Sequence, residues 1–524
     1  MQVIRNWGLA ALGCAALLGL NVSSATAATT APVIRTTPAL DPAFSPTIPN
    51  YVTRCDTGTG ATGTVSVYAR ANGNLVSVDG AASKPGIHDY SVTMTPGQRF
   101  TIQVGTGASA STYNVRCLPT NFPTYSSQEL GPRQVSFVLV TPDQAVSGDD
   151  ASVAYIAMLD SNGVPVWWYD SPDGVPGDAD LDPNGDLSWA TENGPEHFFG
   201  YPGTTSLEVH NLDGQLLDTL NTVGTATDFH EGWPLANGDF LIDSYVPELN
   251  VPIDIPGFPS TVNVLDGTFQ EIAPDGTEVY SWGPAGHINP ADSVPYFYFR
   301  DSWPGISEPL WDWDHINAVQ PYEDGYLVSF RDTESVYYID GATGNVIWKL
   351  GGTYDPGESL TIVGDPDGTQ ELGSQHDVRV WPDGSITVMD NGTKYFRAPR
   401  AVRFSIDYTG GSGSVGTATM MSAFTYPAAK FSICCGSVRA INPSDMATTD
   451  WLIAWGETPY VTEATPTGQT VFELQFGSGD FSYRAVPITS SELTLSQLEN
   501  AMDTMYGTPA ALSGVPYSSP RSRR

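Results

Sequence analysis

Three histidines in this chain occupy equivalent places in a repeated pattern. The sequence contains only seven histidines; His230 and His376 each precede a turn glycine by eight residues, and His315 precedes its turn glycine by ten. Histidine changes protonation near neutral pH, so grouped histidines can supply a nucleophile or base beside a proton donor. If the repeat brings equivalent positions together, three imidazoles meet in one site.

Two chemistries compete for such a site. Three imidazoles can bind Zn²⁺ and leave its fourth position open. However, Arg331 lies six residues after the turn of the hairpin that begins with His315. A guanidinium repels a metal cation but suits a tetrahedral oxyanion, which it can bind through two parallel hydrogen bonds. The histidines and Arg331 therefore predict an anion site without a metal, unless Arg331 only forms an ion pair with Asp332 or Glu334.

Short strands must position these residues. A hairpin with an Asn-Gly or Asp-Gly turn recurs as ADLDPNGDLSWAT, HEGWPLANGDFLIDS, INAVQPYEDGYLVSF and HDVRVWPDGSITVMD, and in degenerate form as VRAINPSDMATTDWLIAWG. Outer strands recur as GVPVWWYD, GQLLDTL, GTEVYSWG, GNVIWKLGG and GQTVFELQFG. Self-similar four-stranded units are typical of a β-propeller. We predict an all-β chain with a six-bladed β-propeller, in which FSYRAVPI pairs with the first blade; a two-sheet solenoid is the alternative.

The remaining sequence divides into smaller parts. The strand-like runs TVSVYARA, DYSVTMT and RFTIQVG precede a Pro-rich joint near residue 125 and suit a small β-sandwich. A helical pattern begins near Leu495. We therefore predict a signal peptide at 1–27, a β-sandwich at 28–125, the propeller at 126–490, and a helix with a tail at 491–524.

The first 27 residues have the composition of a secretory signal peptide. An apolar run from Gly8 to Leu20 precedes an A-x-A cleavage pattern that ends at Ala27. The run is shorter than the roughly 20 apolar residues that span a bilayer. We therefore predict a secreted or periplasmic protein without a membrane span.

The cysteines agree with an oxidising compartment. Cys55 and Cys117 end two strand-like runs, YVTRC and YNVRC, and we expect them to be bridged. Cys434 and Cys435 are adjacent, and a bridge between them requires unusually close Cα geometry. A disulfide and two buried free thiols both remain open for this second pair.

The charge balance excludes two classes of partner. The chain has 58 acidic and 22 basic residues, a formal net charge of −36. Such a charge repels nucleic acids and anionic membranes at long range. The sequence thus favours small molecules as the partners of the predicted anion site.

The stretches WDWDHINAVQ, SFRD, SQHDVRVWPDGSITVMDNG and DFHEGWPLANGDFL resemble the bacterial arylsulfotransferase family. These exported aryl-sulfate sulfotransferases move a sulfuryl group between phenols without a nucleotide donor. The resemblance covers about residues 130 to 480. It implies a six-bladed propeller with three active-site histidines, one of them transiently sulfurylated, no cofactor, and an assembly compatible with a homodimer.

The resemblance also implies roles for individual residues. His376 is the nucleophile, His230 and His315 are the supporting histidines, and Arg331 holds the sulfate. The family places a threonine hydroxyl in the site, and here Ser437 stands at the corresponding place of the sixth unit as a substrate ligand. The reaction implied is sulfuryl transfer from an aryl sulfate to a phenol through a sulfohistidine, with ping-pong kinetics.

Three other functions compete with this interpretation. A propeller can bind glycans or proteins without catalysis, and such a protein would be indifferent to the loss of His376. A quinone-dependent dehydrogenase-like propeller can hold an adjacent-cysteine bridge against its cofactor, and its absorbance would reveal the quinone. A sulfate-ester hydrolase would release sulfate even when a phenol acceptor is present.

Overall fold

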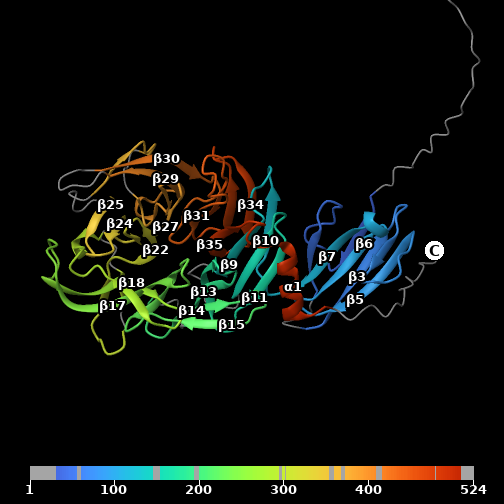
Figure 1. Cartoon of the computed structure of the whole chain (residues 1–524), viewed down its shortest axis with the longest axis horizontal. Helices are drawn as coiled ribbons and strands as arrows, with labels where there is room; N and C mark the ends of the chain where they lie inside the picture. The colour runs from blue at the N-terminus through green and yellow to red at the C-terminus, as the bar shows by residue number, and fades with distance from the viewer. Residues whose placement is uncertain are drawn as a thin grey trace, which may run out of the picture.

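A computed structural model of the chain describes residues 31–55, 61–144, 154–193, 200–293, 298–300, 303–352, 359–367, 372–408, 416–477 and 479–508. The predicted signal peptide lies outside these residues, so it stays a prediction. The chain is almost entirely β-structure, with one α-helix in the described part. Figure 1 shows a large group of sheets on one side and a smaller strand assembly, in blue, on the other.

The N-terminal part has two sheets. The first consists of β1 (Val33–Thr37), β3 (Gly63–Arg70) and β5 (Ile87–Met94), and the second of β2 (Asn50–Arg54), β7 (Ser111–Leu118), β6 (Arg99–Val104) and β4 (Val76–Val78). Side chains of β3 alternate between buried and exposed because one face of the strand packs on a shared core. The expected disulfide between Cys55 and Cys117 is confirmed, with the Cα atoms 5.4 Å apart.

The described residues after the N-terminal part form six sheets. The first two contain β11 (Pro165–Asp170), β10 (Tyr155–Asp160), β9 (Phe137–Gln144) and β35 (Asp480–Ile488), then β12 (Val175–Leu181), β13 (Leu187–Glu192), β14 (Thr205–His210) and β15 (Leu216–Leu220). The third contains β16 (Ala226–Pro234), β17 (Phe240–Pro252), β18 (Thr261–Ile272) and β19 (Glu278–Trp282), extended by β21 (Leu310–Asp312) and β20 (Tyr298–Arg300).

The last three sheets repeat the same order. The fourth contains β22 (Ile316–Tyr322), β23 (Gly325–Phe330), β24 (Ser335–Asp340) and β25 (Val346–Gly351). The fifth contains β27 (His376–Val380), β28 (Ser385–Asp390), β29 (Arg400–Asp407), β30 (Thr417–Thr425) and β26 (Thr361–Val363). The sixth contains β31 (Ser437–Ala440), β32 (Trp451–Ala454), β33 (Tyr460–Ala464), β34 (Thr470–Phe476) and β8 (Tyr125–Glu129). All five predicted hairpins are therefore antiparallel strand pairs.

The innermost strands contact one another in turn, which makes the architecture propeller-like. Contacts link β12 to β16, β16 to β22, β22 to β27, β27 to β31, β31 to β35, and β35 back to β12. The predicted pairing of the last strand with the first sheet is confirmed, since β35 runs antiparallel to β9. An unexpected strand also joins this arrangement: β8, in the predicted Pro-rich joint, pairs with β34. Equivalent positions on the inner strands are thereby brought to one centre.

The C-terminal helix connects the two groups of sheets. Helix α1 (Leu495–Tyr506) begins with a capping box between Thr494 and Gln497. Its apolar face packs into the core next to β11, while Asp503 forms ion pairs with Arg99 and Arg116 of the N-terminal part. Figure 1 shows α1 between these two regions. Among the residues described, no helix combines the length and apolar character needed to cross a membrane.

Candidate active site

The three predicted histidines lie together. The ring centroid of His230 is 5.0 Å from that of His315 and 6.5 Å from that of His376. His230 belongs to β16, His315 immediately precedes β22, and His376 opens β27, so each comes from a different sheet. His230 and His376 are almost fully buried. The three imidazoles that the repeat register predicted to meet therefore lie close together.

Backbone irregularities accompany the histidines. The pairing register shifts between Thr227 and Gly232, between Ile316 and Ala318, and between His376 and Arg379. A β-bulge redirects side chains and ends regular pairing, and such bulges are frequent beside functional sites. His315 itself has a φ of 54°, in the left-handed region that non-glycine residues rarely adopt. A shift in strand register thus accompanies each of the three histidines.

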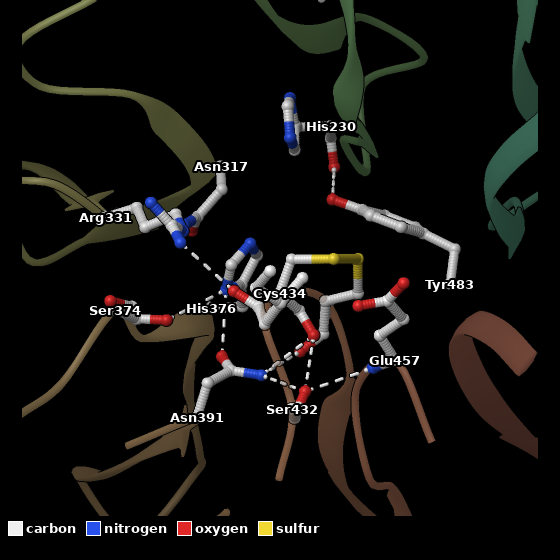
Figure 2. Close-up of a disulfide and its surroundings, with 12 residues drawn as sticks. His230, Asn317, Arg331, Ser374, His376, Asn391, Ser432, Cys434, Glu457 and Tyr483 are labelled. Carbon is white, nitrogen blue, oxygen red and sulfur yellow. Dashed lines mark hydrogen bonds between the residues drawn. A yellow bond between two sulfur atoms is a disulfide. The ribbon is translucent and has the colours of Figure 1, made fainter. Parts of the chain in front are cut away.

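His376 has one fixed and one free ring nitrogen. Its Nδ1 lies 2.9 Å from Oδ1 of Asn391 and 3.2 Å from the carbonyl oxygen of Ser374. Nδ2 of Asn391 donates to the carbonyl oxygens of Cys434, at 2.8 Å, and Cys435, at 3.1 Å (Figure 2). Carbonyl oxygens only accept, so the amide oxygen must face His376, and Nδ1 must carry the proton. The lone pair is therefore on Nε2, which is buried and has no hydrogen-bond partner among the described residues.

The environment of His376 keeps the imidazole neutral. Burial lowers the pKa of His376 well below its ordinary value of 6.5, and the positive charge of Arg331 and the neighbouring histidines lower it further. A neutral imidazole with a free Nε2 lone pair is a nucleophile. This combination matches the role that the family resemblance implies for His376.

The other two histidines are each held by a carboxylate. Nδ1 of His315 lies 2.8 Å from Oδ2 of Asp312, and Nδ1 of His230 is hydrogen bonded to Oδ2 of Asp228. Burial lowers the pKa of His230, although Asp228 opposes this effect. A carboxylate on one ring nitrogen orients the ring and stabilises a protonated form, which can then donate a proton from the other nitrogen.

Arg331 lies beside His376, as Figure 2 shows. Its Nη1 forms an ion pair with Asp332 at 2.5 Å, and its Nη2 donates to the carbonyl oxygen of Ile433 at 3.1 Å. The ion pair with Asp332, which the sequence offered as an alternative to anion binding by Arg331, is present. The pair also orients the guanidinium next to the nucleophile, so the ion pair and a role in anion binding are compatible.

Ser437 has other partners. Its hydroxyl donates to the carbonyl oxygen of Ala485 at 3.1 Å and accepts from the Ala485 N–H at 3.0 Å. These bonds join β31 to β35, so the structure assigns this side chain a place in closing the ring of sheets. A role as substrate ligand stays a prediction.

Several site residues were not found by reasoning from the sequence. Asn391 sets the tautomer of His376, and Tyr483 donates from its hydroxyl to the carbonyl oxygen of His230 at 3.1 Å. Asn317 follows His315 by two residues and presents a buried Oδ1 without a partner among the described residues. Asn391 follows the hairpin in the stretch MDNG, but the other hairpins have no asparagine at the same spacing, so the repeat did not single it out.

A buried network of charges adjoins the histidines. Glu231 accepts from Nη2 of Arg379 at 3.0 Å through both oxygens and from Nη1 of Arg484 at 3.2 Å. Arg379 and Arg439 also bind Asp377, at 3.1 and 2.8 Å. Burial acts to lower the pKa of Arg484, but the carboxylates around it raise the pKa well above the ordinary value. Because Glu231 follows His230 and Asp377 follows His376, the network supports the strands that carry the site.

One group of described residues has the composition of a cation site. Ligand atoms of Asp228, His230 and Asp243 lie within 4.8 Å of one another. Burial raises the pKa of Asp243 well above its usual range, and the carboxylates of Asp228 and Glu231 raise it further. A proton on Asp243 or a bound cation would each relieve this repulsion. Arg331 and the three imidazoles, by contrast, offer N–H donors that suit an anion.

The adjacent cysteines are joined. Cys434 and Cys435 form a disulfide, so of the two states left open by the sequence the structure has the bridged one. Figure 2 shows the disulfide between His376 and Tyr483. Cys435, Phe481 and Tyr483 pack together, with Phe229 and Cys434 against them.

Comparison with known proteins agrees with this geometry. The family model described as "Arylsulfotransferase (ASST)" matches residues 203–477. This segment carries His230, His315, Arg331 and His376. The chain belongs to the arylsulfotransferase family, whose membership supports aryl sulfotransferase activity and small aryl substrates at the level of the family.

Other comparisons add less. No curated protein matches the chain. Among solved structures, the β-propeller domain of Myceliophteria thermophila Cps50 (Swd1) is 9% identical, with 66% of this chain and 99% of that chain covered and a TM-score of 0.31. An auxiliary nutrient binding protein from Bacteroides ovatus is 12% identical, with 82% and 87% covered and a TM-score of 0.31. We draw no conclusion from likenesses at these scores.

Proposed function

We propose that this protein transfers a sulfuryl group from an aryl sulfate to a phenol through a sulfohistidine on His376. The observation that supports this most is the free, buried Nε2 of a neutral His376 whose other nitrogen is held by Asn391. Arg331 and the two supporting histidines surround it with donors for the oxygens of a sulfuryl group. The predicted secretion agrees with a reaction that needs no nucleotide donor.

The first half-reaction is a displacement at sulfur. The Nε2 lone pair of His376 forms the N–S bond as the bond from sulfur to the phenolic oxygen breaks. Arg331 stabilises the equatorial oxygens, as in phosphoryl transfer, where positioning and charge stabilisation supply most of the catalysis. His315, oriented by Asp312, gives a proton to the departing phenoxide.

The second half-reaction reverses the first. An acceptor phenol binds in place of the first product and gives its proton back to His315. Its oxygen attacks sulfur, and the N–S bond electrons return to Nε2 of His376. Each half-reaction uses the same site, so donor and acceptor follow ping-pong kinetics.

The proposal also includes the finer architecture. We infer that the six sheets are the blades of a closed six-bladed propeller over residues 126–490. The two N-terminal sheets would form a β-sandwich over residues 28–125, and residues 491–524 would hold the helix and tail. The contacts among the inner strands and the pairing of β35 with β9 support this division.

The transfer itself can be tested directly. With a chromogenic aryl sulfate alone, the protein should release at most about one equivalent of phenol per site; adding an acceptor phenol should give continuous turnover and a new aryl sulfate ester. Separation of the products by chromatography checks this. Steady release of inorganic sulfate with no new ester would instead identify a hydrolase, and no release at all would favour a binding propeller.

The role of His315 predicts a dependence on the leaving group. Replacing His315 with glutamine should lower kcat/KM by roughly 10²–10⁴-fold for donors whose phenol has a high pKa, since these need protonation as they leave. Donors such as nitrophenyl sulfate, whose phenolate leaves readily, should lose much less. A series of aryl sulfates measures the slope of log(kcat/KM) against phenol pKa. An unchanged slope in the variant would assign the proton to another group.

A further inference from the structure

The Cys434–Cys435 disulfide has no part in the reaction described above, yet its loop touches two residues that do. The carbonyl oxygen of Ile433 accepts from Arg331 at 3.1 Å. The next two carbonyl oxygens, of Cys434 and Cys435, accept from Nδ2 of Asn391 at 2.8 and 3.1 Å. Three consecutive carbonyl groups thus accept hydrogen bonds from Arg331 and Asn391.

These carbonyl groups form a closely packed cradle. Oγ of Ser432 accepts from Asn391 at 2.8 Å and donates to the carbonyl oxygen of Cys434 at 2.8 Å (Figure 2). Glu457 donates its backbone N–H to the same hydroxyl and carbonyl groups. A Cβ at Gly456 would lie 2.0 Å from Oγ of Ser432 and 2.5 Å from the carbonyl oxygen of Cys434. A side chain at position 456 would therefore displace the hydroxyl and carbonyl groups that contact Asn391.

The disulfide constrains the conformation that aims the carbonyl groups. Cys435 has a φ of 68°, a left-handed conformation that costs a non-glycine residue free energy. The covalent ring between adjacent cysteines limits the backbone torsions available to this peptide. Without the bridge, Cys435 can relax towards ordinary torsion angles, and its carbonyl group would turn away from Asn391.

We propose that the Cys434–Cys435 disulfide is a positioning element for the nucleophile, because its loop carbonyls orient Asn391 and thereby hold His376 in the tautomer with a free Nε2. The inference rests on the proposed function of His376. Reduction of the disulfide by a dithiol breaks the S–S bond, adds two electrons and two protons to the sulfurs, and converts the reductant to its cyclic disulfide. Asn391 then loses its fixed orientation, and the amide can present its NH₂ group to His376.

The test compares the full chain with the double variant Cys434→Ala/Cys435→Ala, each with and without dithiothreitol. We expect kcat for aryl sulfate turnover to fall by roughly 10–10²-fold in the variant and in the reduced wild type, as for a small misplacement of reacting groups. Dithiothreitol should have no further effect on the variant. If it lowers the activity of the variant as much as that of the wild type, the effect belongs to Cys55–Cys117 and the inference is wrong.

A second measurement separates positioning from loss of folding. Nitrogen-15 shifts of histidine-labelled protein distinguish the two neutral tautomers of an imidazole, and comparison with His376→Asn assigns the signal. We expect the Nδ1–H tautomer in the oxidised wild type and a mixture in the folded double variant. A single unchanged tautomer with unchanged kcat would overturn this inference while leaving the proposed function intact. Absence of turnover in the oxidised wild type would overturn the proposed function itself.

Discussion

Replacing His376 with asparagine should lower kcat for aryl sulfate turnover by roughly 10⁴-fold or more. Asparagine has no ring nitrogen that can form the N–S bond, so the covalent route is lost while Arg331 and the other histidines remain in place. The asparagine amide does not titrate in the accessible pH range, so no change of pH restores the variant. Initial rates of phenol release from a chromogenic aryl sulfate measure the loss.

The matched control is His88→Asn. His88 lies in β5 of the N-terminal part, where Nε2 is hydrogen bonded to the carbonyl oxygen of Pro85, and its replacement should leave kcat unchanged. Incubation with donor and no acceptor should add the mass of one SO₃ group to the peptide containing His376. Retention of wild-type turnover by His376→Asn, or an adduct on another residue, would refute the assignment of the nucleophile.

The strand order and the meeting of the histidines could be predicted from the sequence because both are consequences of the repeat. Turn glycines and alternating apolar residues set each hairpin, and equivalent places in successive hairpins face the same centre. The repeat pattern was therefore sufficient to predict that His230, His315 and His376 lie together. The same reasoning placed β35 against β9, since a ring of sheets leaves no free edge at its closure.

The partners of the histidines could not be predicted in the same way. The sequence places Asp314 next to His315, but Asp312 binds its Nδ1, while Asp314 accepts from the N–H of Gly267. Asp377, next to His376, faces Arg379 and Arg439 instead. His315 and Asp377 have φ values of 54° and 56°, so the backbone is not regularly extended there and adjacency in sequence is a poor guide to contact.

Contacts between segments that are far apart in the chain also could not be predicted from the sequence. Asn391 is 15 residues from His376, and the carbonyl groups that orient it are more than 40 residues away. The strand β8 pairs with β34 although its residues are mostly exposed and carry no repeat pattern. Such contacts depend on how sheets pack around the centre, which periodicity within one strand does not specify.

The buried network next to the site leads to the second large effect, on stability. Replacing Glu231 with alanine should lower the free energy of unfolding by roughly 3–5 kcal/mol, because Arg379 and Arg484 would keep their charges in the core without this partner. The backbone N–H of Val319, which donates to Oε2 of Glu231 at 3.1 Å, would also lose its acceptor. The midpoint of chemical denaturation, followed by tryptophan fluorescence, measures the change.

Asp367→Ala is the control for this prediction. The Asp367 side chain is 49% exposed and lies 3.1 Å from Nη1 of Arg400, which keeps Asp365 and Asp390 as partners. An exposed ion pair contributes about 1 kcal/mol or less, so this variant should unfold close to the wild-type midpoint. Equal midpoints for the two variants would mean that the charges near the centre are solvated or mutually compensated. Glu231 would then contribute no more to holding His230 in place than an ordinary surface carboxylate.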